Sequence, residues 1–320
     1  MGTEASMTTR ERMLHLASEG QPADDYLPAA FFLHFPDDCH AGPAAVAKHV
    51  EYYRATGNDL MKIQYEHKYP MIEDIRRPGD WSRMPCYGES FYEDQLDVVA
   101  GIVRELGEET VIIVTLYSPF MFASHVVGKE RLLEHFAEDP GAVAKGLGII
   151  VDSMDHLIRG CIDRGVDGFY ASTQGGEIGR LEADVFDEYV KPTDLAVWDL
   201  LRDRTTFNVL HVCDYAAPYA DFDRYIEYPG HVVSAPNEVN GRPISGKEVS
   251  RLFARPFLGG MERLGVISNG PVDAVRREAA AAIESGPRAM ILGADCTLAA
   301  DTDWANIRAA TEVAHARHRR

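Results

Sequence analysis

A chain of 320 residues, 46% of them hydrophobic, is long enough for one large domain or two ordinary ones and can bury a substantial core. Its net charge of −18 argues against nucleic acid and anionic membranes as partners, because both are bound through clustered Lys and Arg. The five cysteines are widely spaced, and the sequence has neither a signal peptide nor an apolar run of about 18 residues that would span a membrane, so we expect a cytoplasmic protein.

In chain order, short apolar runs alternate with helical stretches. Eight runs predict strands, and the clearest is Val111–Leu116, whose β-branched residues predict burial on both faces. The runs are centred near residues 30, 61, 113, 168, 208, 233, 258 and 291. Periodicity and capping residues predict helices at 43–53, 95–106, 129–137, 140–164, 182–203, 221–227, 271–285 and 304–318, and one that begins near Ser245.

Two stretches stand apart from this alternation. Thr8–Ser18 predicts an amphipathic helix and 22–28 a linker, so we assign residues 1–28 to an N-terminal helical extension and 29–320 to one domain. Residues 66–90 are polar and rich in Pro, and they predict a long loop over one end of the fold.

Eight alternations of strand and helix predict an α/β fold, a single (β/α)8 TIM barrel with an N-terminal helical extension. In such a barrel the functional residues lie on the loops at the C-terminal ends of the strands. A doubly wound open sheet is the alternative, but no Gly-x-Gly-x-x-Gly motif follows a predicted strand.

Three metal-ligating side chains fall at predicted strand ends. His211 and Cys213 stand two residues apart at the end of the fifth strand, so their side chains share one face, and Cys296 follows the eighth strand. Imidazole nitrogen and thiolate sulfur are the ligands that zinc prefers, and three protein ligands with an open fourth position are typical of a catalytic zinc site. The pattern therefore predicts an enzyme with a Zn²⁺ centre.

Two other interpretations of this triad stay open. Unpaired Cys residues often pack as small hydrophobic side chains, so the triad is also compatible with a core His beside a buried Cys pair. A purely structural zinc site is the other interpretation, although such sites usually have four Cys or His ligands at short spacings, and His211, Cys213 and Cys296 do not follow that pattern.

Four stretches in the C-terminal third carry a family resemblance: Leu258–Met261, Gly270–Asp273, Leu292–Leu298 and Asp301–Ala309, with weaker similarity at Gly57–Asp59 and Ser118–Phe120. Together they resemble the uroporphyrinogen decarboxylase superfamily. The resemblance extends over most of the chain at low density, and it implies a single (β/α)8 barrel, in agreement with the strand count.

Two branches of that superfamily are relevant. The decarboxylases are metal-free and have an Arg-rich N-terminal segment, whereas this chain has Phe31–Asp38 without Arg at the comparable place. The zinc methyltransferases, which include methylcobalamin:coenzyme M enzymes, have His-x-Cys and a distant Cys, which matches His211, Cys213 and Cys296. The resemblance to this branch implies a zinc-dependent methyltransferase or demethylase that moves a methyl group between a corrinoid, such as methylcobalamin, and a small thiol.

The resemblance also bears on the fourth ligand and on partners. Asp214 departs from the Gly that is common in the methyltransferase branch. Cobalamin-independent methionine synthase has a similar set of His and Cys zinc ligands and adds a Glu from an intermediate strand end. Glu238 is the nearest candidate for that Glu here. The sequence lacks the corrinoid-binding Asp-x-His-x-x-Gly motif, so a corrinoid would come on a separate protein. A homodimer is one assembly that stays open.

Other strand-end residues are candidates for substrate contacts. We expect Tyr117, Gln174, Glu177 and Asp214 to line the pocket for a small-molecule substrate. The alternative for 174–177 is an ordinary Gly turn. Asp214, like Asp295, is predicted either to orient His211 or to cap a helix.

His34 and Asp59, assigned to the ends of the first two strands, are the candidates for direct catalytic roles, although His34 is also compatible with a satisfied core histidine. Two other functions stay open beside methyl transfer. One is a metal-free decarboxylase of a carboxylated substrate with Asp59 as its acid group. The other is a barrel that binds a corrinoid or small thiol without turnover.

Overall fold

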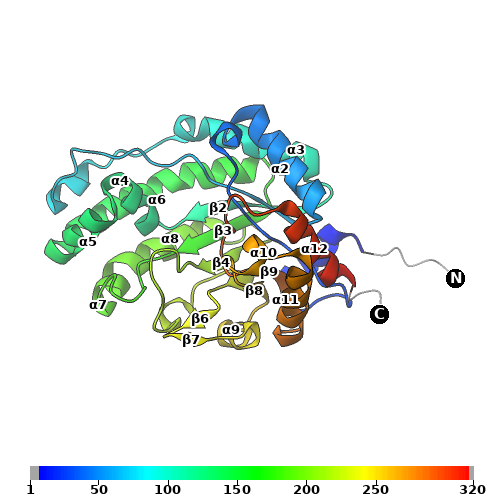
Figure 1. The fold of residues 1–320 in the computed structure, drawn as a ribbon. Coiled ribbons are helices and arrows are strands. Elements are labelled where there is room, and N and C mark those ends of the chain that lie inside the picture. Colours follow the sequence, from blue (N-terminus) through cyan, green and yellow to red (C-terminus); the bar gives the residue numbers. More distant parts are fainter. Residues whose placement is uncertain (1–6, 317–320) are drawn as a thin grey trace.

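Seven parallel strands form one curled sheet in the order β1-β2-β3-β4-β5-β8-β9 in the computed structural model, which describes residues 7–316. Helices connect the strands and pack around the sheet (Figure 1). Parallel neighbours require such crossover connections. The predicted α/β alternation is confirmed, and the arrangement is of the TIM-barrel type, although its backbone ladder does not close.

The strands are β1 (Leu60–Ile63), β2 (Val111–Tyr117), β3 (Gly168–Thr173), β4 (Val209–Val212), β5 (Val232–Ser234), β8 (Phe257–Met261) and β9 (Met290–Ala294), with a small hairpin of β6 (Glu238–Val239) and β7 (Arg242–Pro243). The helices are α1 (Thr9–Glu19), α2 (Gly42–Thr56), α3 (Glu93–Leu106), α4 (Pro119–Val127), α5 (Lys129–Glu138), α6 (Pro140–Asp163), α7 (Ala183–Val185), α8 (Lys191–Leu201), α9 (Gly246–Phe253), α10 (Val266–Asn269), α11 (Val272–Ser285) and α12 (Trp304–Ala316).

The segment predicted as the first strand lies beside β9 without forming a regular strand. It makes two isolated parallel bridges, Ala29 with Leu292 and Leu33 with Leu298. Toward β1, the Asp59 amide donates to the Ala29 carbonyl at 2.8 Å and the Phe31 amide donates to the side chain of Asn58 at 3.1 Å, so isolated contacts replace a regular ladder. The prediction of eight regular strands is therefore wrong here, and residues 29–33 fill a seam between the two edge strands of the sheet.

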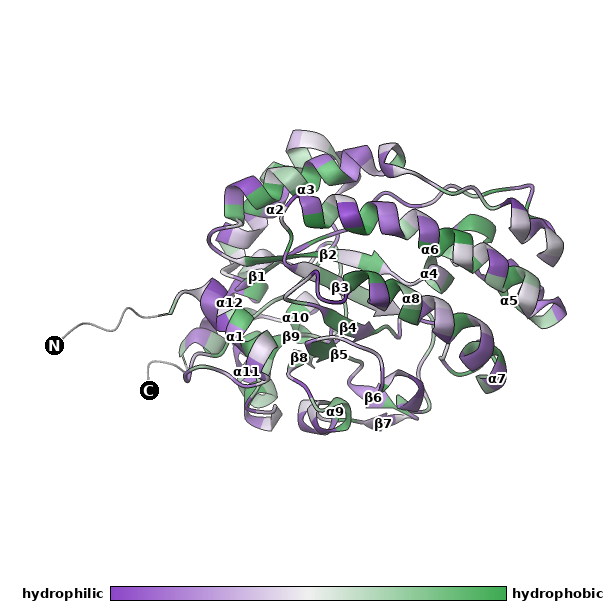
Figure 2. Cartoon of the chain, turned by 180° about the vertical axis from the view of Figure 1, so that it is seen from behind, coloured by the Kyte–Doolittle hydropathy of each residue, from purple (hydrophilic) through white to green (hydrophobic). Residues whose placement is uncertain are grey.

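Side chains alternate between the two faces of the curled sheet. On β1, Leu60 joins the apolar cluster inside the curl, while Met61 and Ile63 join the cluster beneath the helices. In Figure 2 the strands of the curled sheet are mostly hydrophobic, whereas the helices carry both hydrophobic and hydrophilic residues. This period of two determines which strand residues face the interior.

Helix α1 seals the N-terminal end of the curl. Thr8 and Glu11 form a capping box that starts the helix, and Met13 and Leu16 pack into the inner cluster. Arg10 holds the helix in place through hydrogen bonds of 2.7 and 2.6 Å to Asp167, just before β3. At the opposite end of the curl, loops follow the C-terminal ends of the strands.

Two connections differ in how well their form was predicted. Residues 66–90 contain no strand or α-helix, as predicted for a loop, but they include a 3-10 helix at Pro78–Arg83 that packs against α6, where the Trp81 ring fills the space that a Cβ on Gly146 would occupy. The helix predicted at 221–227 is wrong, because only a 3-10 turn at Asp223–Tyr225 forms. Buried aromatic rings anchor this connection instead of helical hydrogen bonds.

Within residues 7–316, no helix combines the length and apolarity needed to cross a membrane.

Candidate metal centre

His211, Cys213 and Cys296 meet at the C-terminal ends of the strands. His211 lies in β4, Cys213 directly follows it, and Cys296 lies two residues beyond the end of β9. One ligand atom from each side chain lies within 4.8 Å of the other two, and all three residues are buried. The structure thus brings together the residues that strand spacing had grouped. Across the described part of the chain, no other set of His, Cys, Asp and Glu meets this spacing.

The donor set fits one tetrahedral ion. His211 Nε2 and Cys296 Sγ are 3.4 Å apart. With metal–nitrogen and metal–sulfur distances of about 2.0 and 2.3 Å, zinc would separate such a pair by about 3.5 Å. The two ligand strands therefore already lie at the spacing that zinc requires. That the ion is zinc stays a prediction.

Ser234 and Tyr170 hold the His211 ring. His211 Nδ1 lies 3.2 Å from Ser234 Oγ, which lies 3.3 Å from the Tyr170 hydroxyl. The Tyr170 ring also packs on the imidazole at a centroid distance of 4.8 Å. A partner on Nδ1 fixes the ring and directs Nε2 toward the two sulfurs. Neither residue was predicted from the sequence, although Ser234 is the polar end of an otherwise apolar strand.

The two thiols differ in acidity. A hydrogen bond with Cys213 lowers the pKa of Cys296 well below its usual range, and the neighbouring His211 and Arg263 add to this shift against the effect of burial. The same hydrogen bond and burial raise the pKa of Cys213. Cys296 is therefore the sulfur that ionises first, and thiolates are the form that binds metals.

Asp214 and Asp295 hold an arginine rather than the histidine. Arg263 Nη1 lies 2.9 Å from Asp214 and 3.3 Å from Asp295, and its backbone amide donates to Asp295 at 2.7 Å. Burial raises the pKa of Asp295 to about 6, while Arg263 opposes the shift. The prediction that these carboxylates orient His211 is wrong, because Ser234 occupies that position. The role of Asp214 in substrate binding stays a prediction.

The other predicted substrate residues lie at different distances from the triad. The Gln174 amide nitrogen is 3.4 Å from Cys213 Sγ. The pKa of Tyr117 is raised by burial and then by the charges of Glu66 and the two cysteines, which places its hydroxyl within electrostatic reach of them. Glu177 is buried in its own loop, where it accepts a hydrogen bond from the Gly175 amide. Of the three, only Gln174 contacts a triad residue.

Glu238 and His34 lie outside the triad. Glu238 is exposed on β6 of the small hairpin, and it does not join the ligand atoms of His211, Cys213 and Cys296. The structure therefore does not support Glu238 as the fourth ligand. His34 lies beyond the seam segment, with Nδ1 2.8 Å from Glu66, so its partner is a carboxylate at the C-terminal end of β1.

The comparisons with known proteins agree with this architecture. Residues 60–317 match the family model described as uroporphyrinogen decarboxylase (URO-D). The chain belongs to the uroporphyrinogen decarboxylase family. No curated protein matches the sequence.

Solved structures show how widely the family fold is shared. A methyltransferase from Methanosarcina mazei is 15% identical, with a TM-score of 0.76 over 97% of this chain and 98% of that chain. A B12-independent methionine synthase from Shewanella sp. W3-18-1 is 9% identical, with a TM-score of 0.58 over 90% of this chain and 97% of that chain. At these identities the similarity concerns the fold.

In this member of the uroporphyrinogen decarboxylase family, Asp59 is not at the mouth of the curl. It precedes β1 and so lies at the N-terminal end of the strands, opposite to Cys296. Its carboxylate accepts hydrogen bonds from the Ala29 amide at 2.8 Å and from the Tyr26 hydroxyl, and it lies 2.7 Å from His315 Nε2. The prediction that Asp59 ends a strand is wrong, and its contacts join the N-terminal linker to α12.

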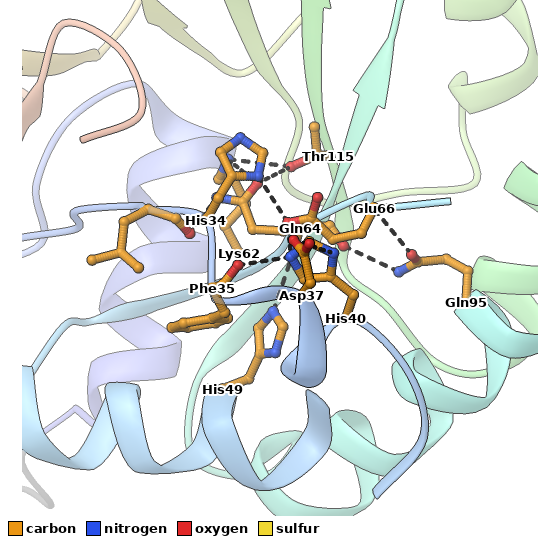
Figure 3. A network of polar contacts seen from close by, with 11 residues as sticks. His34, Phe35, Asp37, His40, His49, Lys62, Gln64, Glu66, Gln95 and Thr115 are labelled. Atoms are coloured by element: carbon orange, nitrogen blue, oxygen red, sulfur yellow. Dashed lines mark hydrogen bonds and ion pairs between the residues drawn. The ribbon is translucent and has the colours of Figure 1, made fainter. Parts of the chain in front are cut away.

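A buried polar network that the sequence analysis missed lies beside the triad. Figure 3 shows Lys62 of β1 with Gln64 and Thr115, next to Glu66 and His34. The Lys62 ammonium donates to Gln64 Oε1 at 3.0 Å and to Thr115 Oγ1 at 3.2 Å. The available signal was a Lys on the inward-facing register of an apolar strand.

A small cavity lies between β2, β3 and α8. It measures about 20 Å³ and is lined in part by Thr173, Asp194 and Tyr228. Asp194 accepts hydrogen bonds from Tyr228 at 3.0 Å and Thr173 at 3.1 Å, while its other oxygen has no partner. Burial raises the pKa of Asp194 to about 7.

Asp194→Asn is expected to change how stability depends on pH. Because the folded protein raises the Asp194 pKa from 3.8 to about 7, it holds this proton more tightly than the unfolded chain does. The wild type should therefore lose stability relative to the variant as pH rises from about 4 to about 7, by roughly 4 kcal/mol at most, with no further change above that range. Urea denaturation of both proteins across this range measures the difference. A difference that does not vary with pH would contradict the expectation.

Proposed function

We propose that this protein is a zinc-dependent methyltransferase that transfers a methyl group between a corrinoid, or another methyl donor, and a small thiol. His211, Cys213 and Cys296 would hold the ion. The observation that carries the proposal is the convergence of these three ligand atoms within 4.8 Å at the strand ends. Two proteins of similar fold, a methyltransferase and a B12-independent methionine synthase, support the same reaction class.

Each residue around the triad has a defined task in this reaction. Ser234 fixes the His211 ring through Nδ1, so that Nε2 stays directed at the sulfurs. Gln174 donates to Cys213 Sγ and so stabilises its thiolate form. Bound zinc would supply a fourth coordination position at which a substrate thiol becomes a thiolate at neutral pH.

A methyl donor carried by a partner protein would dock at the same end of the strands. Four of the most exposed large apolar side chains follow strands at this end, namely Met71, Ile178, Tyr215 and Leu264, after β1, β3, β4 and β8. The chain lacks a corrinoid-binding motif, so a corrinoid protein that docks at this end would present the methyl group to the thiolate.

The test combines metal content with a product assay. Protein purified without chelator should contain about one zinc per chain by elemental analysis, and it should methylate a small thiol when supplied with methylcobalamin. Wild-type protein that binds no zinc after reconstitution would overturn the proposal. Zinc without turnover for any thiol and donor would favour the non-catalytic binding alternative.

The decarboxylase alternative gave the acid role to Asp59. Asp59 lies at the opposite end of the strands from the triad and is already engaged by Ala29, Tyr26 and His315. A carboxyl group held in this way does not face the end of the curl where family substrates are expected. We therefore retain methyl transfer as the single proposed reaction.

A further inference from the structure

Lys62 is a buried ammonium group without an ion pair. Its side chain points into the curled sheet and is 5% exposed. Besides Gln64 and Thr115, its Nζ contacts two aromatic faces, 4.8 Å from the Phe32 centroid and 4.7 Å from the Tyr170 centroid. No carboxylate in residues 7–316 lies within the 4.0 Å of an ion pair. An ammonium removed from water at a cost of several kcal/mol normally has an anion as its partner.

The negative charges that act on Lys62 are those of the triad sulfurs and of Glu66, and the Glu66 carboxylate already has His34 as its partner. Burial lowers the pKa of Lys62 to about 8, and the negative charges of Cys296, Glu66 and Cys213, in that order, oppose this shift. The Tyr170 ring connects the two sites, because it contacts both the Lys62 ammonium and the His211 imidazole. The positive charge of Lys62 is thus one aromatic ring away from a metal ligand.

The charge of the centre depends on its fourth ligand. A divalent ion with two thiolates and a neutral imidazole has no net charge. A neutral fourth ligand leaves the centre neutral, whereas a substrate thiolate makes it an anion with one negative charge. A nearby buried cation therefore stabilises only the second state.

We propose that Lys62 is a positioning residue that supplies the countercharge for an anionic fourth ligand, so that the centre selects a thiolate over a neutral ligand. The inference rests on the proposed function and names the specificity of the same site. The rings of Phe32 and Tyr170 hold the Lys62 ammonium in place. Gln64 and Thr115 accept its hydrogen bonds and so fix its orientation.

The test is Lys62→Met, compared with Lys145→Met, which removes the same charge from an exposed position on α6. Cobalt(II)-substituted proteins are titrated with 2-mercaptoethanol and, separately, with imidazole, and both are followed by absorption. Buried charges about 6–10 Å apart change affinity by about 10- to 100-fold at an effective dielectric constant of about 20. Lys62→Met should weaken thiol binding by this factor and leave imidazole binding unchanged, while Lys145→Met changes neither.

Three further results separate this role from a structural one. Lys62→Met should not lower Tm, because replacing a buried charge with an apolar side chain is often neutral or stabilising, and Lys62→Arg should recover part of the thiol affinity. If Lys62→Met left the affinity for the thiol unchanged, or lowered the affinities for the thiol and imidazole equally, the inference would be overturned. The proposed zinc centre would not be affected by either result. A wild type that binds neither zinc nor cobalt would overturn the proposed function and the inference together.

Discussion

Cys296→Ala should reduce the zinc content from about one ion per chain to almost none, and methyl transfer should fall by about 10³-fold or more. The variant removes one of three protein ligands, the sulfur whose pKa is lowered, and it leaves His211 and Cys213 too few to hold the ion. A metal that stabilises charge in the transition state contributes several kcal/mol, and each 1.36 kcal/mol is about tenfold in rate. Elemental analysis and a product assay on the same preparation measure the two losses.

Cys161→Ala is the matched control. Cys161 is also a buried, unpaired cysteine, but it lies on α6 and outside the triad. Its replacement should leave both zinc content and activity at the wild-type level. If Cys296→Ala retained full activity without metal, the thiols would be ordinary core residues, and the zinc methyltransferase proposal would fail.

Asp59→Ala should lower the free energy of unfolding by about 3–5 kcal/mol while zinc content and activity per folded molecule stay unchanged. Asp59 is buried and receives contacts from Tyr26, Ala29 and His315, so the variant leaves the buried Ala29 amide and two part-buried groups without their common acceptor. Urea denaturation measures the stability, and assays at low temperature, where the variant is folded, measure activity.

Asp97→Ala controls for the loss of one negative charge, because Asp97 is exposed on α3. It should change stability by less than about 0.5 kcal/mol. A folded, zinc-containing Asp59→Ala protein without activity would return Asp59 to a role in catalysis and would contradict the placement of the reaction at the other end of the strands.

The triad was accessible from the sequence because its geometry depends on short-range rules. Residues two apart on a strand share a face, and the C-terminal ends of parallel strands meet at one edge of the sheet, so His211, Cys213 and Cys296 needed no tertiary detail. Asp59 shows the limit of the same argument. Its strand was identified, but Asp59 precedes that four-residue strand and so lies at the end opposite to the triad.

The residues that support the triad could not be predicted in this way. Ser234, Tyr170 and Lys62 come from three different strands, and their contacts with His211 and with one another depend on strand register across the sheet. Glu238 failed for a related reason, because the chain after β5 turns away into a hairpin instead of continuing toward the ligands. Such features depend on tertiary packing, which local pattern does not encode.

Because of the seam at residues 29–33, metal binding would also affect the stability of the sheet. Cys296 lies between Leu292 and Leu298, the two residues whose isolated bridges attach the seam segment, and β5 and β8 separate β9 from β4 in the sheet. An ion bound by His211, Cys213 and Cys296 would therefore cross-link two strands that are not paired in the sheet, close to the seam where the regular backbone ladder is interrupted. Because such binding stabilises only the folded chain, the concentration of free zinc would determine how firmly this barrel-like sheet holds together as well as whether it reacts.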